Sequence, residues 1–310
     1  MAYWGYSGAM ILFPPRRKIW LCFVCAVLAA SAASFASAAP QLPPINQPPT
    51  NQRLSGKLIW FDLLTNNVDA AKQFYGSVFG WTFSDVPDSQ RRFSVISIGN
   101  ERIGGIFQPA SPAAAGRPAH WLTFISVPDV DATARYAKSN GGQILAGPTS
   151  VPARGTHLVM RDPQGALFGV LKSDSGDPLD DPAQPGEILW ADLFVSKPVD
   201  AAAFYRGLVG WRSGRRAAGG AKERLVMSAG GFARAGITVL PDGAKPGWLP
   251  YVQVQDVAAT LKRVTNAGGR ILTPPSPDVL GGRLAVIADP QGGVIGVVHW
   301  IPPGKKGGSQ

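Results

Sequence analysis

An aromatic residue and a carboxylate stand two positions apart in two similar stretches of the chain. They are Trp60 and Asp62 in LIWFDLLT, and Trp190 and Asp192 in ILWADLFV. Both stretches predict β-strands, and side chains two apart on a strand share a face. A carboxylate on an inward face needs a partner, because burying it unpaired is costly. Each aspartate therefore either orients a ligand or acts as a general base, or it is a structural carboxylate bonded to backbone or to a neighbouring arginine.

The two stretches belong to a long internal repeat. Residues 56–81 and 186–211 align without gaps at an offset of 130, and the later parts align at an offset of 127. A repeat of this length indicates two homologous domains rather than a solenoid of short units. The shared positions include Gly56/Gly186, Phe74/Phe204, Tyr75/Tyr205, Gly80/Gly210, Trp81/Trp211, Trp121/Trp248, Asp129/Asp256 and the DPQG turns at 162–165 and 289–292.

Within each copy the hydrophobic period changes from that of a strand to that of a helix. In the first copy, residues 68–79 place apolar side chains on one helical face, Asn67 is suited to cap the helix and Gly80 to end it. Three short strands follow, and the same order then begins again with HWLTFISV and a helix capped by Asp129. The sequence therefore predicts an α+β fold of four βαβββ modules.

The βαβββ order, the FY…FGW helix end, the PDVDA junction and the DPQG turn resemble the vicinal oxygen chelate superfamily, which includes glyoxalase I, extradiol dioxygenases and bleomycin-resistance proteins. The resemblance covers nearly the whole chain after its first 55 residues and is closest to tandem glyoxalase-like proteins. It implies two tandem domains, each curving into a cup. One fold hosts many reactions, so the resemblance predicts the fold more specifically than the chemistry.

Metal-dependent members line the cup with His, Gln or Glu. The resemblance places the corresponding positions on Trp60 and Trp190 in the first strands, and on Gly169 and Gly296 in the last strands. Neither residue type offers a side-chain metal ligand. We therefore expect no metal cofactor. The alternative is a divalent ion on a displaced set in the first domain, formed by Asp62, His120 and His157.

Six of the nine tryptophans recur between the two copies. Trp81 and Trp211 follow helix ends, and we expect them to pack in the core. The other four lie on strands that would line the cups. Their positions are consistent both with contact to a ligand and with packing in the core. The predicted ligand-binding residues are Trp60, Asp62, Trp121, Trp190, Asp192 and Trp248.

The front of the chain predicts export to the periplasm or the medium. Arg16, Arg17 and Lys18 precede the apolar run IWLCFVCAVLAASAA and an A-x-A site at residues 36–38, which is the order of a secretory signal. Both cysteines lie in this signal, so the mature chain would have no disulfide or thiolate site and no stable membrane anchor. The net charge of +10 comes from scattered basic residues, which argues against a nucleic-acid partner.

These patterns divide the chain into six parts. We predict a signal peptide (1–38), a disordered linker (39–55), a first glyoxalase-like domain (56–172), a second linker (173–185), a second glyoxalase-like domain (186–300) and a flexible tail (301–310).

The expected function is binding of a small, partly apolar molecule in a metal-free cleft. Two alternatives remain open. One is a metal-dependent lyase or dioxygenase of the same superfamily with displaced ligands, and the other is a non-catalytic scaffold for protein partners. The sequence does not specify the oligomeric state.

Overall fold

The computed structural model describes residues 42–87, 92–109, 116–214 and 224–301. The predicted signal peptide, with both cysteines, and the predicted tail beyond residue 301 lie outside the described residues. Within the described part of the chain, no helix is long and apolar enough to cross a membrane.

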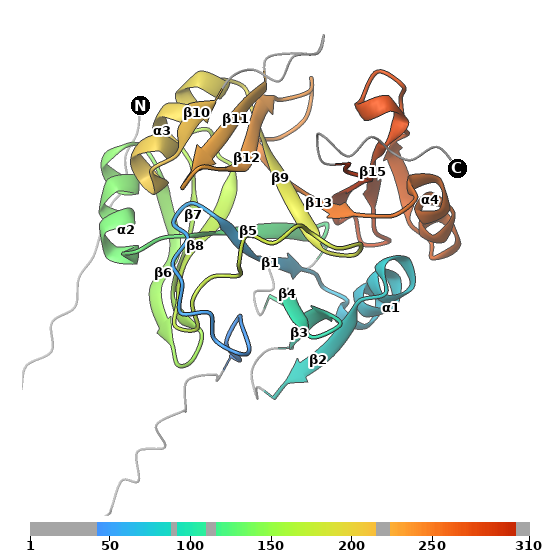
Figure 1. Cartoon of the computed structure of the whole chain (residues 1–310), viewed down its shortest axis with the longest axis horizontal. Coiled ribbons are helices and arrows are strands. Elements are labelled where there is room, and N and C mark those ends of the chain that lie inside the picture. Colours follow the sequence, from blue (N-terminus) through green and yellow to red (C-terminus); the bar gives the residue numbers. More distant parts are fainter. Residues whose placement is uncertain (1–41, 88–91, 110–115, 215–223, 302–310) are drawn as a thin grey trace, which may run out of the picture. The chain divides into compact units, whose positions relative to one another are not determined.

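Two eight-stranded sheets and four α-helices dominate the described fold, which confirms the predicted α+β class with two tandem domains (Figure 1). The order of the first sheet is β2-β3-β4-β1-β5-β8-β7-β6, and that of the second is β10-β11-β12-β9-β13-β16-β15-β14. The two orders are equivalent strand by strand, as expected of a duplicated domain. In each sheet the two central strands pair antiparallel, joining the two βαβββ modules.

The strands of the first sheet are β1 (Leu58–Leu64), β2 (Thr82–Val86), β3 (Phe93–Ile98), β4 (Glu101–Phe107), β5 (His120–Ser126), β6 (Gln143–Val151), β7 (Gly155–Arg161) and β8 (Leu167–Ser173). Those of the second are β9 (Ile188–Val195), β10 (Arg212–Gly214), β11 (Arg224–Ala229), β12 (Phe232–Val239), β13 (Gly247–Gln253), β14 (Arg270–Thr273), β15 (Leu284–Ala288) and β16 (Val294–Val298). The helices are α1 (Val68–Phe79), α2 (Val130–Ser139), α3 (Pro198–Val209) and α4 (Val257–Asn266).

The predicted helix signals act as expected. The side chains of Asn67, Asp129 and Asp256 each accept a hydrogen bond from the backbone N–H three residues later. Gly80 ends α1 in the left-handed conformation at φ 75°, which a residue without Cβ adopts at no steric cost. Lys197, at the start of α3, makes no side-chain cap bond.

The helices of one domain pack against those of the other. Helix α1 contacts α4 and α2 contacts α3, as Figure 1 also shows. Two cores result, and each combines residues of the first domain with residues of the second. We call the sheet face that carries the helices the outer face, and the opposite one the inner face.

Repeated aromatic residues tie the two domains together through these cores. The Tyr75 hydroxyl donates to Asp289 Oδ2 over 2.9 Å, and the Tyr205 hydroxyl donates to Asp162 Oδ2 over 3.3 Å. Each tyrosine of an FY pair thus meets the DPQG aspartate of the other domain. Burial, and then the charge of the aspartate, raises the pKa of each tyrosine well above its usual value, so both stay protonated donors.

Trp81 and Trp211 complete the same arrangement. Their indole N–H groups donate to the carbonyls of Gly186 and Gly56, each in the other domain, over 2.7 and 2.8 Å. Both tryptophans are buried, at 3% and 0% exposure, which confirms the prediction of core packing. The repeated glycines and aromatics therefore form matched contacts between the two domains.

Candidate functional site

The predicted tryptophan–aspartate pairs lie on the two inner faces. On β1, Trp60 Nε1 donates to Asp62 Oδ1 over 2.7 Å, and on β9, Trp190 Nε1 donates to Asp192 Oδ1 over 2.8 Å. Strand geometry explains the contact, because alternate residues project to one side. Each indole therefore fixes the carboxylate that stands beside it.

A glycine on the neighbouring parallel strand makes room for each carboxylate. A Cβ at Gly105 would lie 2.6 Å from Asp62 Oδ1, and a Cβ at Gly236 would lie 1.9 Å from Asp192 Oδ1. Real Cβ atoms do not approach so closely, so any other residue would displace the carboxylate. The glycine-containing strands β4 and β12 therefore determine where the two acids sit.

Trp121 and Trp248, also predicted to bind ligand, lie on the outer faces. Trp121 pairs with Leu63 across the β5–β1 ladder and Trp248 with Leu193 across the β13–β9 ladder, and all four side chains belong to the shared cores. Trp121 Nε1 donates to the Tyr75 hydroxyl over 3.2 Å. Their placement favours the core-packing interpretation and leaves them outside the candidate site.

On the first inner face, the Trp60–Asp62 pair is joined by a buried cation. Arg154 directly precedes β7. Its guanidinium lies 3.7 Å from the centre of the Trp60 ring, which is a cation–π contact. Burial lowers the pKa of Arg154 to about 10, against the opposing effect of Asp62. Burial also raises the pKa of Asp62, and Arg154 and the Trp60 indole partly offset it.

The rest of the first inner face is apolar and packed. Trp60, Leu122 and Phe124 are 1%, 5% and 6% exposed. Ile45, from the segment that precedes β1, packs against them and is 1% exposed. The chain itself therefore fills the surface where the sequence predicts a ligand.

The packed segment at residues 42–55 differs from the disordered linker that the sequence predicted at residues 39–55. Residues 42–55 form neither helix nor strand, yet they pack on the first domain (dark blue in Figure 1). Asp177, which is fully buried, holds the end of the segment by accepting from Leu54 N and Ser126 Oγ over 2.5 and 2.6 Å. The first part of the predicted second linker thus serves as its clamp, because its polar groups meet those of the segment.

The second inner face is arranged differently. Trp190 and Leu249 are only partly buried, and the side chain of Arg224 is 38% exposed. Arg224 Nη2 donates to Asp192 Oδ1 over 2.7 Å, and its guanidinium lies 5.8 Å from the Trp190 ring centre. Burial, followed by the charge of Asp192, raises the pKa of Tyr251 well above its usual value.

The two cations come from different places in the repeat. Arg224 begins β11 and matches Phe93 at the start of β3, because Val226 faces Gly236 as Val95 faces Gly105. Arg154 aligns with Gly281 at the offset of 127. Comparison of repeated positions therefore missed both arginines. The signal that could have found them is the need of a buried carboxylate for a cationic partner.

The positions that correspond to metal ligands in the resemblance do not fit an ion. Trp60 and Trp190 occupy the first-strand positions, and aromatic rings fill the space at the two glycines. A Cβ at Gly169 would lie 2.3 Å from the Phe124 ring, and one at Gly296 would lie 2.1 Å from the Tyr251 ring. A glutamate at either place would displace a ring of the inner face.

The displaced ligand set does not assemble either. Within the described ranges, no group of three or more His, Cys, Asp or Glu side chains is close enough to hold a metal ion, so Asp62, His120 and His157 do not converge. Burial, and then Arg154, lowers the pKa of His157, while burial and then Arg161 lower that of His120. The two histidines lie on different strands, His120 on β5 and His157 on β7.

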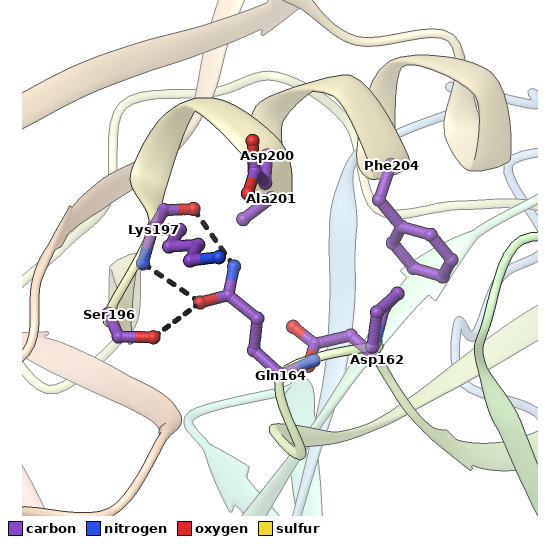
Figure 2. A pocket seen from close by; sticks show the side chains of 8 residues that line it. Asp162, Gln164, Ser196, Lys197, Asp200, Ala201 and Phe204 are labelled. Atoms are coloured by element: carbon purple, nitrogen blue, oxygen red, sulfur yellow. Dashed lines mark hydrogen bonds between the residues drawn. The ribbon is translucent and has the colours of Figure 1, made fainter.

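A cavity of about 390 Å³ lies away from both inner faces, between the first DPQG turn and the start of α3 (Figure 2). Gln164 bridges it. Its Oε1 accepts from Ser196 Oγ and Lys197 N over 2.9 and 2.8 Å, and its Nε2 donates to Lys197 O over 2.9 Å. The glutamine pairs with both main-chain groups of Lys197, the residue at the start of α3, so its polar atoms are engaged in holding this joint between the domains.

Comparisons with known proteins agree with this architecture. A family model described as the Glyoxalase/Bleomycin resistance protein/Dioxygenase superfamily matches residues 57–170, and one described as a glyoxalase-like domain matches residues 190–298. The protein named "Putative glyoxylase CFP32" of Mycobacterium tuberculosis is 30% identical over 258 residues, which cover 82% of this chain and 99% of that protein. The anthracycline biosynthesis protein DnrV of Streptomyces peucetius is 28% identical over 260 residues, covering 79% and 93%.

Solved structures share the fold at low sequence identity. The Mn(II)-bound glyoxalase from Novosphingobium aromaticivorans superposes with a TM-score of 0.56 at 16% identity, covering 80% of this chain and 83% of that one. A variant of homoprotocatechuate 2,3-dioxygenase from B. fuscum gives a TM-score of 0.56 at 14% identity, covering 83% and 74%. At these identities the likeness concerns the fold alone.

Proposed function

The chain belongs to the Glyoxalase/Bleomycin resistance protein/Dioxygenase superfamily, and from that premise we propose that it binds a small, partly apolar molecule on its second inner face without a metal ion. The observation that carries this proposal is that Trp190 and Arg224 are partly exposed beside the buried Asp192. The matching surface of the first domain is buried beneath the chain's own Ile45.

The chemistry of this group suits a flat molecule with a polar acceptor. Trp190 offers an aromatic surface, and such surfaces contribute much of the binding energy in small-molecule sites. Asp192 is fixed by the Trp190 indole and Arg224, so it can orient a donor of the ligand. Within the described part of the chain, Arg224 Nε has no hydrogen-bond partner, and a ligand acceptor would supply one.

The names of two relatives suggest a first probe. DnrV and the similar DauV of a Streptomyces strain are named as anthracycline biosynthesis proteins. An anthracycline has a planar polycyclic body with carbonyl and hydroxyl groups, which matches the proposed division between Trp190 and its polar neighbours.

The metal-free part of the proposal rests on the residues at the family's ligand positions. They are Trp190 and Gly296 in the second domain, and the Tyr251 ring fills the space beside the glycine. We also propose that the protein is exported, because the basic and apolar order of residues 16–38 is that of a secretory signal. N-terminal sequencing of the protein from the periplasm or medium tests export, and an intact Met1 in purified native protein would contradict it.

Fluorescence titration with an anthracycline tests the binding site. We expect Trp190→Ala and Arg224→Gln to weaken binding at least tenfold, because they remove the aromatic surface and the cation. Val199→Ala, on an exposed position of α3, is the matched control and should bind like the unaltered chain.

Metal content is measured on the same samples, purified without chelator. Less than 0.1 equivalent of any divalent ion per chain is expected, as an order-of-magnitude threshold for adventitious metal. A stoichiometric ion would contradict the metal-free site. Equal anthracycline binding by Trp190→Ala and the unaltered chain would contradict the second inner face as the site.

A further inference from the structure

The segment that fills the first inner face is held by one buried anchor. Ile45 contacts the apolar cluster that contains Trp60 and Phe124 and is 1% exposed. Leu42 packs against the same cluster and is partly buried. An isoleucine side chain buried to this degree accounts for much of the contact between the segment and the sheet.

Side chains of the first domain bind the main chain of the segment. Arg154 Nη1 donates to Pro43 O over 3.2 Å, and Arg102 Nη1 donates to Pro44 O over 2.8 Å. Proline has no N–H group, so its carbonyl is the main-chain group that remains for recognition. Two arginines therefore bind the carbonyl groups of the two consecutive prolines that directly precede the isoleucine anchor.

Asn46, the residue after the anchor, is bound by Ser175 and Gly176. Asn46 N donates to Ser175 Oγ over 3.1 Å, and Asn46 Nδ2 donates to Gly176 O over 2.7 Å. Asn46 is itself buried, at 8% exposure. These contacts give the backbone N–H and the side-chain amide N–H of the asparagine a partner, as burial requires.

The contacts differ from those of a strand that belongs to a sheet. In the described part of the segment, Thr50 is the first residue whose N–H bonds to a backbone carbonyl, that of Ser175. Residues 42–47 are thus held by an apolar anchor and by hydrogen bonds that involve side chains. Bound peptides are recognised in the same way, through anchors and satisfied main-chain groups.

In the described part of the second domain, no arginine stands at the positions that match Arg102 and Arg154. Arg102 matches Ala233 by the pairing of β4 and β12, and Arg154 aligns with Gly281. Residues 173–177, which precede the second domain as the segment precedes the first, bind the segment itself. The peptide contacts are therefore particular to the first domain.

We propose that the first inner face is a peptide-binding site for an extended Pro-Pro-Ile-Asn sequence, and that its resident ligand is the chain's own residues 42–47. Because the ligand is tethered, its effective concentration is high and it excludes a free peptide. Removal of the anchor opens the site to the same sequence supplied in trans. This proposal concerns the first domain and is independent of ligand binding on the second.

The test uses the full chain with Ile45→Asp and a fluorescein-labelled peptide of residues 41–54. A carboxylate at position 45 cannot enter the apolar site without a partner, so the tethered segment should dissociate. By fluorescence anisotropy, the peptide should bind the Ile45→Asp chain at least tenfold more tightly than it binds the unaltered chain. A peptide with the same Ile→Asp change should bind at least tenfold more weakly than the natural peptide.

Two controls keep the result interpretable. Val199→Asp makes a similar apolar-to-acid change at an exposed position, and that chain should exclude the peptide as the unaltered one does. Hydrogen exchange reports whether residues 42–54 are released in the Ile45→Asp chain while the strands stay protected. Release without peptide binding would overturn the proposal, and so would continued protection of the segment or equal binding of the two peptides.

Discussion

The two inner faces share a tryptophan–aspartate pair but differ in what lies against it. On the first, Arg154 stacks on Trp60 and the chain's own Ile45 completes the packing. On the second, Arg224 binds Asp192 and remains partly exposed beside Trp190. The difference shows that duplication preserved the frame while the contents of the two surfaces diverged.

The preserved frame is the set of contacts between the domains. The tyrosine–aspartate and tryptophan–glycine bonds are present in both directions, with Tyr75–Asp289 matched by Tyr205–Asp162. A change in one member would weaken a core that both domains share. The inner faces carry no such mutual constraint, which allows their contents to differ.

The largest expected difference between the two faces is in stability. Trp60→Ala should lower the free energy of unfolding by about 3–5 kcal/mol, the usual range for a fully packed large aromatic residue. Trp190→Ala should cost only about 1 kcal/mol, because Trp190 is already partly exposed. Urea denaturation of both variants measures the contrast, and equal losses would mean that the second face is packed as tightly as the first.

The two arginines should differ in the same direction, by a smaller amount. Arg154→Gln removes a buried guanidinium that binds Trp60 and Pro43 O, and we expect a loss of about 2 kcal/mol, within the range for hydrogen bonds to charged groups. Arg224→Gln removes a pair whose cation is 38% exposed and whose carboxylate is 9% exposed, so the expected loss is about 1 kcal/mol, between the values for a surface ion pair and for a buried charged hydrogen bond. Thermal and urea unfolding should both show the larger loss of stability for Arg154→Gln. A larger loss for Arg224→Gln would mean that the second inner face is the more tightly packed one.

The smallest expected difference depends on pH. Burial and Arg154 lower the pKa of His157 in the folded chain, so the unfolded chain binds a proton first as the pH falls below about 6.5. Stability is therefore lost as the pH decreases from that value through the folded pKa. His157→Gln should reduce this loss without abolishing it, because the lowered pKa of His120 acts in the same direction.

The matching residue of the second domain, Leu284, does not titrate, so a Leu284→Gln chain is the control for the polar substitution. Its stability should show the same dependence on pH as that of the unaltered chain. An unchanged slope in His157→Gln between pH 5 and 7, on the order of the usual histidine range, would mean that His157 is more open to water than the first inner face allows.

The repeat and the helix signals predicted the fold because they depend on local chemistry. Asn67, Asp129 and Gly80 act through their own turns, and the period of apolar residues follows directly from helix geometry. The pairing of Trp60 with Asp62 was predictable for the same reason. Residues two apart on a strand must share a face.

Other features depended on contacts that the sequence does not encode locally. Strand β5 is apolar on both faces, so alternation could not tell that Trp121 points outward and Phe124 inward. The segment around Ile45 has no period and a composition typical of linkers, and its order comes from Arg102 and Arg154 far along the chain. Such contacts are visible only after the sheet has formed.

The central claim is that the first inner face is closed by the chain itself and the second is open to a small molecule. Oxidative footprinting of the folded, unaltered chain, with mass spectrometry of each tryptophan, tests it without any ligand. We expect Trp190 to be modified at least tenfold faster than Trp60, which is 1% exposed. Equal rates of modification of Trp60 and Trp190 would contradict the account.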